Sequence, residues 1–111
     1  MFYQFKPKGE QRVHWGHTVS TDLIHWEDLQ PAIYPILEKD CYSGQTLVED
    51  NRVIAIYHGT ELGNCIAVSS DAMLNKWDKL QDNPVIPIVP VDKNILSVER
   101  LFSNVFLFSI R

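Results

Sequence analysis

Residues 15–29 read W-G-H-T-V-S-T-D-L-I-H-W-E-D-L, and part of this stretch returns at residues 67–80 as A-V-S-S-D-A-M-L-N-K-W-D-K-L. In both copies a strand-like segment ends in Ser-x-Asp, and a Trp and then a Leu follow. The two tryptophans, Trp26 and Trp77, stand 51 positions apart. A repeat of short strands with a period of about fifty residues is typical of the blades of a β-propeller. The stretch therefore predicts an all-β fold built from blade-like units.

Turn-forming residues divide the sequence around the two copies into short strand patterns. We expect residues 26–29 and 32–34 to form a short edge strand flanked by Pro31 and Pro35, because a proline lacks the backbone donor that an inner strand needs. The triplet 49–51, Glu-Asp-Asn, predicts a hairpin turn, and residues 71–76 are expected to hold one helical turn. Strands about every ten residues, with no long helical period, predict about two blades of antiparallel strands. The expected strands are 2–5, 13–20, 26–29 with 32–34, 45–48, 52–57, 64–69 and 77–80.

The bulk composition argues against several classes of partner. The 111 residues suffice for one ordinary domain, and a net charge of -4 with scattered basic residues gives no electrostatic basis for binding nucleic acid. No apolar stretch reaches the roughly 18 residues of a membrane-spanning helix, so no membrane partner is expected. The N-terminal M-F-Y-Q-F-K-P does not have the pattern of a signal peptide. We leave the localisation open.

The histidines and cysteines do not form a recognisable metal-binding pattern. The histidine spacings fit no standard zinc site, so we expect structural or solvent-facing roles and neither a metal nor a cofactor. Two cysteines are too few for a disulfide framework, and both are expected to be reduced. Asp22 and Asp71 stand at the same corner of the two copies, which favours a turn-capping role over a catalytic one. The histidines and cysteines of the chain are His14, His17, His25, His58, Cys41 and Cys65.

Five segments in a fixed order carry a family resemblance. They are F-Y-Q-F-K-P at 2–7, the run at 15–29, P-A-I-Y-P at 31–35, C-Y-S-G-Q at 41–45 and N-P-V-I-P at 83–87. Through them the chain resembles, over about residues 2–88, the catalytic domain of glycoside hydrolase family 32. That family contains invertases, sucrose-6-phosphate hydrolases, levanases and inulinases. The resemblance implies a five-bladed β-propeller, of which this chain would be a part, and a fructose-containing saccharide as the ligand.

The resemblance also implies four substrate-binding residues. Gln4 stands where the family's Tyr-Gln supplies an amide to the fructosyl unit, and Trp15 stands at the Trp of Trp-Gly-His, which lines the sugar subsite. Tyr42 and Ser43 stand at the aromatic-Ser-Gly motif, where a ring and a hydroxyl face the sugar. Aromatic rings pack on the C–H faces of sugars, and polar groups meet the hydroxyls. The structural alternatives are core packing for Trp15, an outward strand position for Gln4 and a turn for Tyr42 and Ser43.

For the other two tryptophans we expect core packing. Trp26 and Trp77 recur in both copies, and a sugar subsite would not recur in that way. A Trp in a strand pattern is buried by default, because it is large and mostly apolar. The two residues are therefore assigned to the construction of the blades.

The residues that would cleave a glycosidic bond do not appear in this sequence. The family uses an Asp nucleophile in an Asn-Asp-Pro-Asn-Gly motif and a Glu acid in a Glu-Cys motif, and neither motif occurs here. Retaining hydrolysis needs both carboxylates. We therefore expect no catalytic residue in the chain and no hydrolysis by it alone. Where the family has an Asp-Pro motif after Pro87, this chain has none, and the local match of Glu99-Arg100 is too poor to carry a role.

These observations lead to a two-part description of the chain. Residues 1–90 are expected to be a fragment of the propeller catalytic domain, and residues 91–111 a divergent tail of unknown role. The parent enzyme would hydrolyse β-fructofuranosyl bonds in sucrose or fructans. Two alternatives stay open: a non-catalytic carbohydrate-binding protein or pseudoenzyme built from the same blades, and a truncated gene product without a function of its own.

Overall fold

The computed structural model describes residues 1–88, which form eight strands and no helix. The all-β prediction is confirmed for this part of the chain, and the helical turn expected at 71–76 is wrong, because these residues form turns and bends. No helix that could cross a membrane occurs among residues 1–88. The tail predicted at 91–111 lies outside the described residues. The strands are β1 (Phe2–Phe5), β2 (His14–Val19), β3 (Glu27–Ile33), β4 (Cys41–Glu49), β5 (Arg52–Gly59), β6 (Gly63–Ser69), β7 (Asp78–Lys79) and β8 (Ile86–Pro87).

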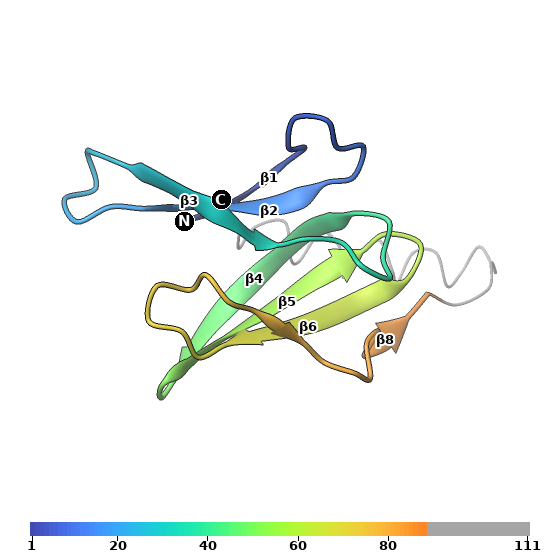
Figure 1. The fold of residues 1–111 in the computed structure, drawn as a ribbon. Helices are drawn as coiled ribbons and strands as arrows, with labels where there is room; N and C mark the ends of the chain where they lie inside the picture. Colours follow the sequence, from blue (N-terminus) through green and yellow to red (C-terminus); the bar gives the residue numbers. More distant parts are fainter. Residues whose placement is uncertain (89–111) are drawn as a thin grey trace.

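The strands form two antiparallel sheets that face one another (Figure 1). The first sheet has the order β1-β2-β3, and the second has the order β4-β5-β6-β7, with β8 also paired to β6. The predicted hairpin is confirmed, because Glu49 pairs with Arg52 across a two-residue turn. Asp50 in that turn has a φ of 50°, a left-handed conformation that Asp tolerates better than most residues.

The edge strand β3 differs from the prediction in one detail. Pro31 lies inside β3 and does not flank it. Trp15 of β2 pairs with Ile33, and His17 pairs with Leu29. A step of two positions along β2 therefore corresponds to a step of four positions along β3, and the extra residues of β3 form a bulge around Pro31. A proline is tolerated there because bulges and edge strands leave backbone donors unpaired in any case.

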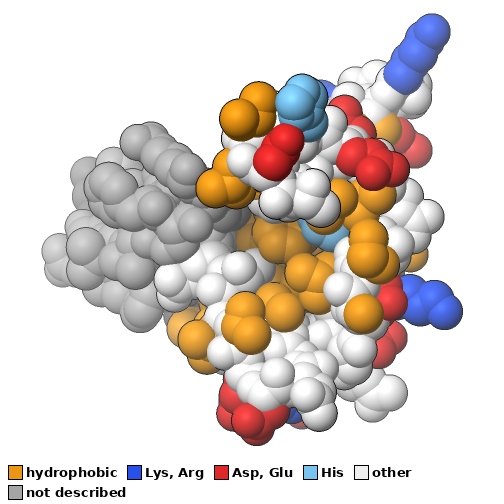
Figure 2. Space-filling view, turned by 90° about the vertical axis from the view of Figure 1, so that its left-hand side faces the viewer, with side chains coloured by type: hydrophobic (Ala, Val, Ile, Leu, Met, Phe, Trp, Pro, Cys, Tyr) orange, Lys and Arg blue, Asp and Glu red, His pale blue; other side chains and the backbone are white. Residues whose placement is uncertain are grey.

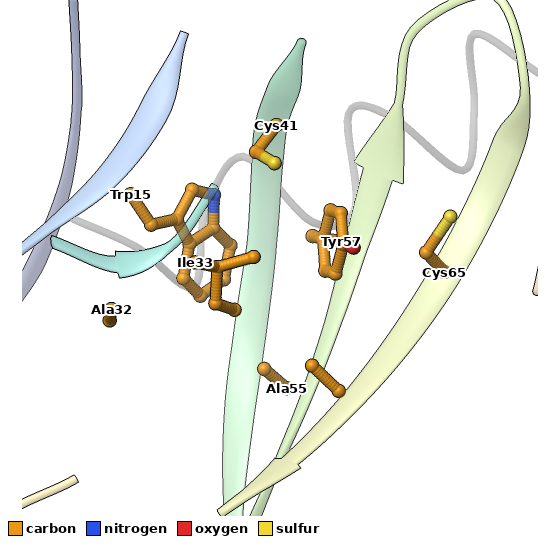
Figure 3. Packing of buried hydrophobic residues seen from close by; sticks show 8 residues of the cluster. Trp15, Ala32, Ile33, Cys41, Ala55, Tyr57 and Cys65 are labelled. Carbon is orange, nitrogen blue, oxygen red and sulfur yellow. The ribbon is translucent and has the colours of Figure 1, made fainter. Parts of the chain in front are cut away.

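The hydrophobic core lies between the two sheets (Figure 3). Trp15 and Ile33 come from the first sheet, and Ala55, Tyr57 and Cys65 come from the second. All five are at most 1% exposed. The ring centroids of Trp15 and Tyr57 are 5.8 Å apart, so an aromatic contact joins the two sheets directly.

The two recurring tryptophans do not share the predicted burial. Trp77 packs partly buried against the core, with its ring 5.7 Å from that of Phe2. Trp26 is 44% exposed, so its predicted core role is wrong in the described structure. It lies on the rim of a hollow of about 470 Å³ between the corner at 20–26 and the loop at 72–74. Figure 2 looks onto this end of the molecule, where hydrophobic side chains gather around the hollow.

Both Ser-x-Asp corners are capped by their aspartates. Oδ1 of Asp22 accepts hydrogen bonds from the backbone N–H groups of Ile24 (2.9 Å) and His25 (2.8 Å). Oδ2 of Asp71 accepts one from the N–H of Asn75 (2.8 Å). The predicted turn-capping role is therefore confirmed for both residues.

Candidate functional site

The structure brings together the four residues that the sequence marks as substrate-binding. Gln4 of β1 and Trp15 of β2 are direct cross-strand partners, so their side chains lie on the same face of the first sheet. Tyr42 and Ser43 lie at the start of β4, the strand of the second sheet that contacts β1 and β2. The four residues therefore meet where the two sheets adjoin, although up to 39 positions separate them in the chain.

A bulge at the start of β4 sets the direction of Tyr42 and Ser43. Cys41 pairs with Gly59 and Gly44 pairs with Tyr57, so β4 has one extra residue between these pairs. Gly44 is required at this point, because a Cβ there would lie 2.1 Å from the backbone oxygen of Ile56. A bulge of this kind re-aims side chains that a regular strand would place alternately on its two faces.

Two hydrogen bonds join the residues of the site in pairs. Nε2 of Gln4 donates to Oγ of Ser43 over 3.0 Å. Nε1 of Trp15 donates to the backbone oxygen of Tyr42 over 2.7 Å. Each bond crosses from the first sheet to the second, so the exposed surface of the site has a fixed shape.

Exposure divides the four residues into a front layer and a back layer. The Tyr42 ring is 41% exposed and Gln4 is exposed as well, whereas Ser43 is 7% exposed and Trp15 is not exposed at all. The sequence indicated Trp15 as a lining residue of a subsite. In the described structure its indole instead packs in the core and holds the Tyr42 backbone from behind.

A buried ion pair lies behind the site. The Glu38 carboxylate, 2% exposed, accepts hydrogen bonds from the Lys79 ammonium, the Tyr57 hydroxyl (3.1 Å) and the Cys41 thiol (3.3 Å). Burial alone would raise the pKa of Glu38, but the hydrogen bond and charge of Lys79 outweigh it and lower the pKa below its ordinary value. Burial, with the charge of Glu38, raises the pKa values of the Tyr57 hydroxyl and the Cys41 thiol, so both groups are neutral at pH 7.

Asp40 ties the segment before β4 to both sheets. Its Oδ1 accepts a hydrogen bond from the N–H of Val13 over 2.7 Å. Its backbone N–H donates to the Thr60 hydroxyl over 2.9 Å, and its backbone oxygen accepts from the Thr60 N–H over 3.0 Å. The bulge at Tyr42 therefore begins from an anchored residue.

The sequence interpretation did not single out Glu38, Asp40 or Lys79. The only signal was a run of charged residues, Glu38-Lys39-Asp40, placed directly before the C-Y-S-G-Q segment. Charged residues at a strand start are usually solvated, and Lys and Glu are almost never fully buried unless they are paired. The partner Lys79 is 41 positions away, so the chain alone does not reveal the pair.

The site has the chemistry of a binding surface. It presents an exposed phenol ring, an exposed amide and a nearly buried hydroxyl. The two carboxylates behind it are already engaged, Glu38 by Lys79 and Asp40 by Val13 and Thr60. Within residues 1–88 no cluster of three or more His, Cys, Asp or Glu could hold a metal ion, and both cysteines are free and buried.

A comparison with family models and a comparison with individual proteins give consistent results. The model of the glycosyl hydrolases family 32 N-terminal domain matches residues 1–97. The chain is 38% identical over 101 residues to a beta-fructofuranosidase, cell wall isozyme, of Zea mays, an alignment that covers 77% of this chain and 17% of the relative. It is 38% identical over 103 residues to a levanase of Bacillus subtilis, covering 78% of this chain and 15% of that protein. The chain thus spans about a sixth of the length of these relatives.

Proposed function

The chain belongs to glycosyl hydrolase family 32, and from this premise we propose that it forms a saccharide-binding wall of a β-fructosidase that hydrolyses β-fructofuranosyl bonds in sucrose or fructans. The observation that carries the proposal is the meeting of Gln4, Trp15, Tyr42 and Ser43 in one hydrogen-bonded surface. The names of the relatives, beta-fructofuranosidase and levanase, support the class of sugar.

Each of the four residues has a proposed role in this wall. The Tyr42 ring packs against an apolar C–H face of the fructosyl unit, and the Gln4 amide hydrogen-bonds to its hydroxyls. Ser43 orients the Gln4 amide through the 3.0 Å bond between them. Trp15 contributes from behind, by holding the backbone of Tyr42 through the 2.7 Å bond to its oxygen.

For the fold, the proposal is that the two sheets are neighbouring blades of a five-bladed propeller. The period of the repeated stretch and the face-to-face packing of the sheets support this arrangement. The second sheet has four consecutive strands, as a complete blade does, and the first has three. Residues 1–90 would form this unit. The wall then lies where the two blades adjoin.

The proposal assigns binding to this chain and hydrolysis to carboxylates outside it. Retaining glycosidases need two carboxyl groups about 5–5.5 Å apart, one as nucleophile and one as acid. Glu38 is paired with Lys79 behind the wall and is 2% exposed, which does not suit either role. We therefore expect the 111-residue chain to bind fructosides without releasing fructose.

The test is a titration of the 111-residue chain with sucrose and with 1-kestose, followed by NMR. Saturable shifts of the Gln4 side-chain amide and the Trp15 indole N–H are expected. Tyr42→Ala should weaken this binding about tenfold, because a stacked ring contributes roughly 1 kcal/mol beyond its area. Trp26→Ala is the matched control, since it removes an equally exposed ring outside the site.

Two outcomes would contradict the proposal. One is the absence of any shift at Gln4 and Trp15 at saturating sugar. The other is an equal loss of affinity in Tyr42→Ala and Trp26→Ala. A parallel assay of fructose release from sucrose and inulin tests whether the chain binds sugar without hydrolysing it. Turnover by the purified chain would refute the assignment of hydrolysis to carboxylates outside it.

A further inference from the structure

A second concave surface lies at the outer edges of the two sheets. Strand β3 is the edge of the first sheet and β7 is the edge of the second, and both lie on the side that Figure 1 presents to the viewer. Between them is a groove of about 590 Å³, and a hollow of about 240 Å³ shares Ala32, Tyr34, Trp77 and Asp78 with it. None of the four residues of the candidate site lines this groove.

Two hydrogen bonds beside the groove join the edges of the two sheets. Nε2 of Gln30 donates to the backbone oxygen of Asn75 over 3.5 Å, and Nζ of Lys79 donates to the backbone oxygen of Tyr34 over 2.6 Å. The bulge around Pro31 lies between Gln30 and Tyr34. The two bonds therefore fix the edges of the two sheets relative to each other on either side of this bulge.

The lining of the groove combines aromatic rings with hydrogen-bonding groups. The Tyr34 ring is 56% exposed, its centroid is 6.3 Å from that of His14, and Trp77 forms part of the opposite wall. Gln30 supplies an exposed amide. Asn75 lines the same wall as Trp77, with its Oδ1 buried.

We propose that this groove is a second saccharide site, which takes one or two units of a fructan chain with a sugar face on Tyr34 and hydroxyls on Gln30. The sugar class rests on the proposed function, whereas the site rests on the lining of the groove. Two carboxylates that line it, those of Glu10 and Asp78, add acceptors for further hydroxyls. The volume falls within the range of about 300–1,000 Å³ that is usual for small-molecule sites.

The three tryptophans allow the two sites to be observed separately. The indole N–H of Trp15 reports on the candidate site, because it donates to Tyr42. The indole N–H of Trp77 reports on the groove and donates to the oxygen of Leu74 over 2.8 Å. Trp26 lines neither site and serves as the internal control. The experiment is an NMR titration of the 111-residue chain with 1-kestose and, separately, with maltotriose.

We expect 1-kestose to shift the Trp77 indole and the Gln30 amide in a saturable way, and maltotriose to leave them in place. Tyr34→Ala should weaken the binding seen at Trp77 about tenfold and leave the binding seen at Trp15 unchanged. Tyr34→Phe should restore it, because the ring is kept. Tyr42→Ala is the matched variant, and it should affect the Trp15 signal alone.

The outcomes separate this proposal from the proposed function. Shifts at Trp15 without shifts at Trp77 and Gln30 would overturn the second site and leave the proposed function standing. Shifts at Trp77 and Gln30 without shifts at Trp15 and Gln4 would support the second site and contradict the proposed function. Equal responses to maltotriose would overturn the fructan specificity. A loss of the Trp77 response in Tyr42→Ala would overturn the independence of the two sites.

Discussion

The two copies of the repeated stretch fold into the same corner and then pack in different ways. At residues 20–25 and 69–75 an aspartate accepts hydrogen bonds from backbone N–H groups two to four residues ahead. Beyond the corner the likeness ends. Trp77 lies against Phe2 and the core, whereas Trp26 is 44% exposed and makes no ring contact or hydrogen bond within residues 1–88.

Two positions after the tryptophans, the equivalent residues Asp28 and Lys79 differ even more. Asp28 accepts a hydrogen bond from the Tyr3 hydroxyl over 3.2 Å at the surface. Lys79, at the same place in the second copy, is 17% exposed and pairs with the buried Glu38. The difference shows that a corner is determined by its own few residues. The surroundings of the strand that follows are determined by which sheet lies opposite.

The largest effect is expected from breaking the contact that only the second copy has. Lys79→Met removes the partner of a buried carboxylate and should lower the free energy of unfolding by about 3 kcal/mol at pH 7. The equivalent change in the first copy, Asp28→Ala, removes a surface hydrogen bond and should cost less than about 1 kcal/mol. Urea unfolding followed by tryptophan fluorescence measures both.

The pH dependence of stability and a double variant test whether an unpaired buried carboxylate causes the loss of stability in Lys79→Met. In the wild type the pKa of Glu38 is lowered, so its contribution to stability is full above about pH 4.3 and declines as the pH falls through the folded-state pKa. In Lys79→Met, burial without a partner raises the Glu38 pKa, so the deficit should shrink toward about pH 4. Glu38→Gln combined with Lys79→Met should recover part of the stability, and no recovery would argue against an unpaired charge as the cause.

A smaller difference is expected between the two tryptophans. Trp77→Ala should cost about 2 kcal/mol, because a half-buried ring leaves part of its volume empty next to Phe2. Trp26→Ala should change the free energy of unfolding by less than about 0.5 kcal/mol, as is usual for surface positions. Equal losses in denaturant unfolding would mean that both rings are buried in solution and would remove the distinction between the copies.

The smallest effects are expected at the two corners, where the copies are alike. The pKa of Asp22 is strongly lowered, chiefly by its hydrogen bond to His25 and then by backbone N–H groups, and the pKa of Asp71 is lowered by the N–H of Asn75. A lowered pKa stabilises the folded state above the unfolded value of about 3.9, and this contribution is lost as the pH falls further. In both Asp22→Asn and Asp71→Asn, the free energy of unfolding should fall less than in the wild type when the pH is lowered from about 4 to 2. The difference from the wild type should be larger for Asp22→Asn. Because both carboxylates are exposed, high salt should reduce the effects, and carboxyl titration by NMR measures the two pKa values directly.

The features that were predicted correctly from the sequence are those that depend on residues close together in the chain. The corners at Asp22 and Asp71, the hairpin at 49–51 and the strands themselves follow from turn chemistry and alternation within a few positions. The burial of Trp26 was predicted wrongly because a repeated sequence pattern predicts the same local turn in both copies, whereas burial depends on the sheet that lies opposite. The bulge at Pro31 was missed because a bulge is defined by the register of two strands.

By itself, the sequence determined the all-β class of the fold and the family, because ordered motifs and local turn signals can be recognised without coordinates. It also pointed to Gln4, Trp15, Tyr42 and Ser43, which the structure brings together. The tertiary structure alone decided how these residues act. It placed Trp15 behind Tyr42, joined Gln4 to Ser43 and paired Glu38 with Lys79, over separations of 27, 39 and 41 residues. It also opened a groove between β3 and β7 that no local pattern indicates. The physical reason is that burial and pairing depend on two surfaces in contact, and each copy of the repeat supplies only one of these two surfaces.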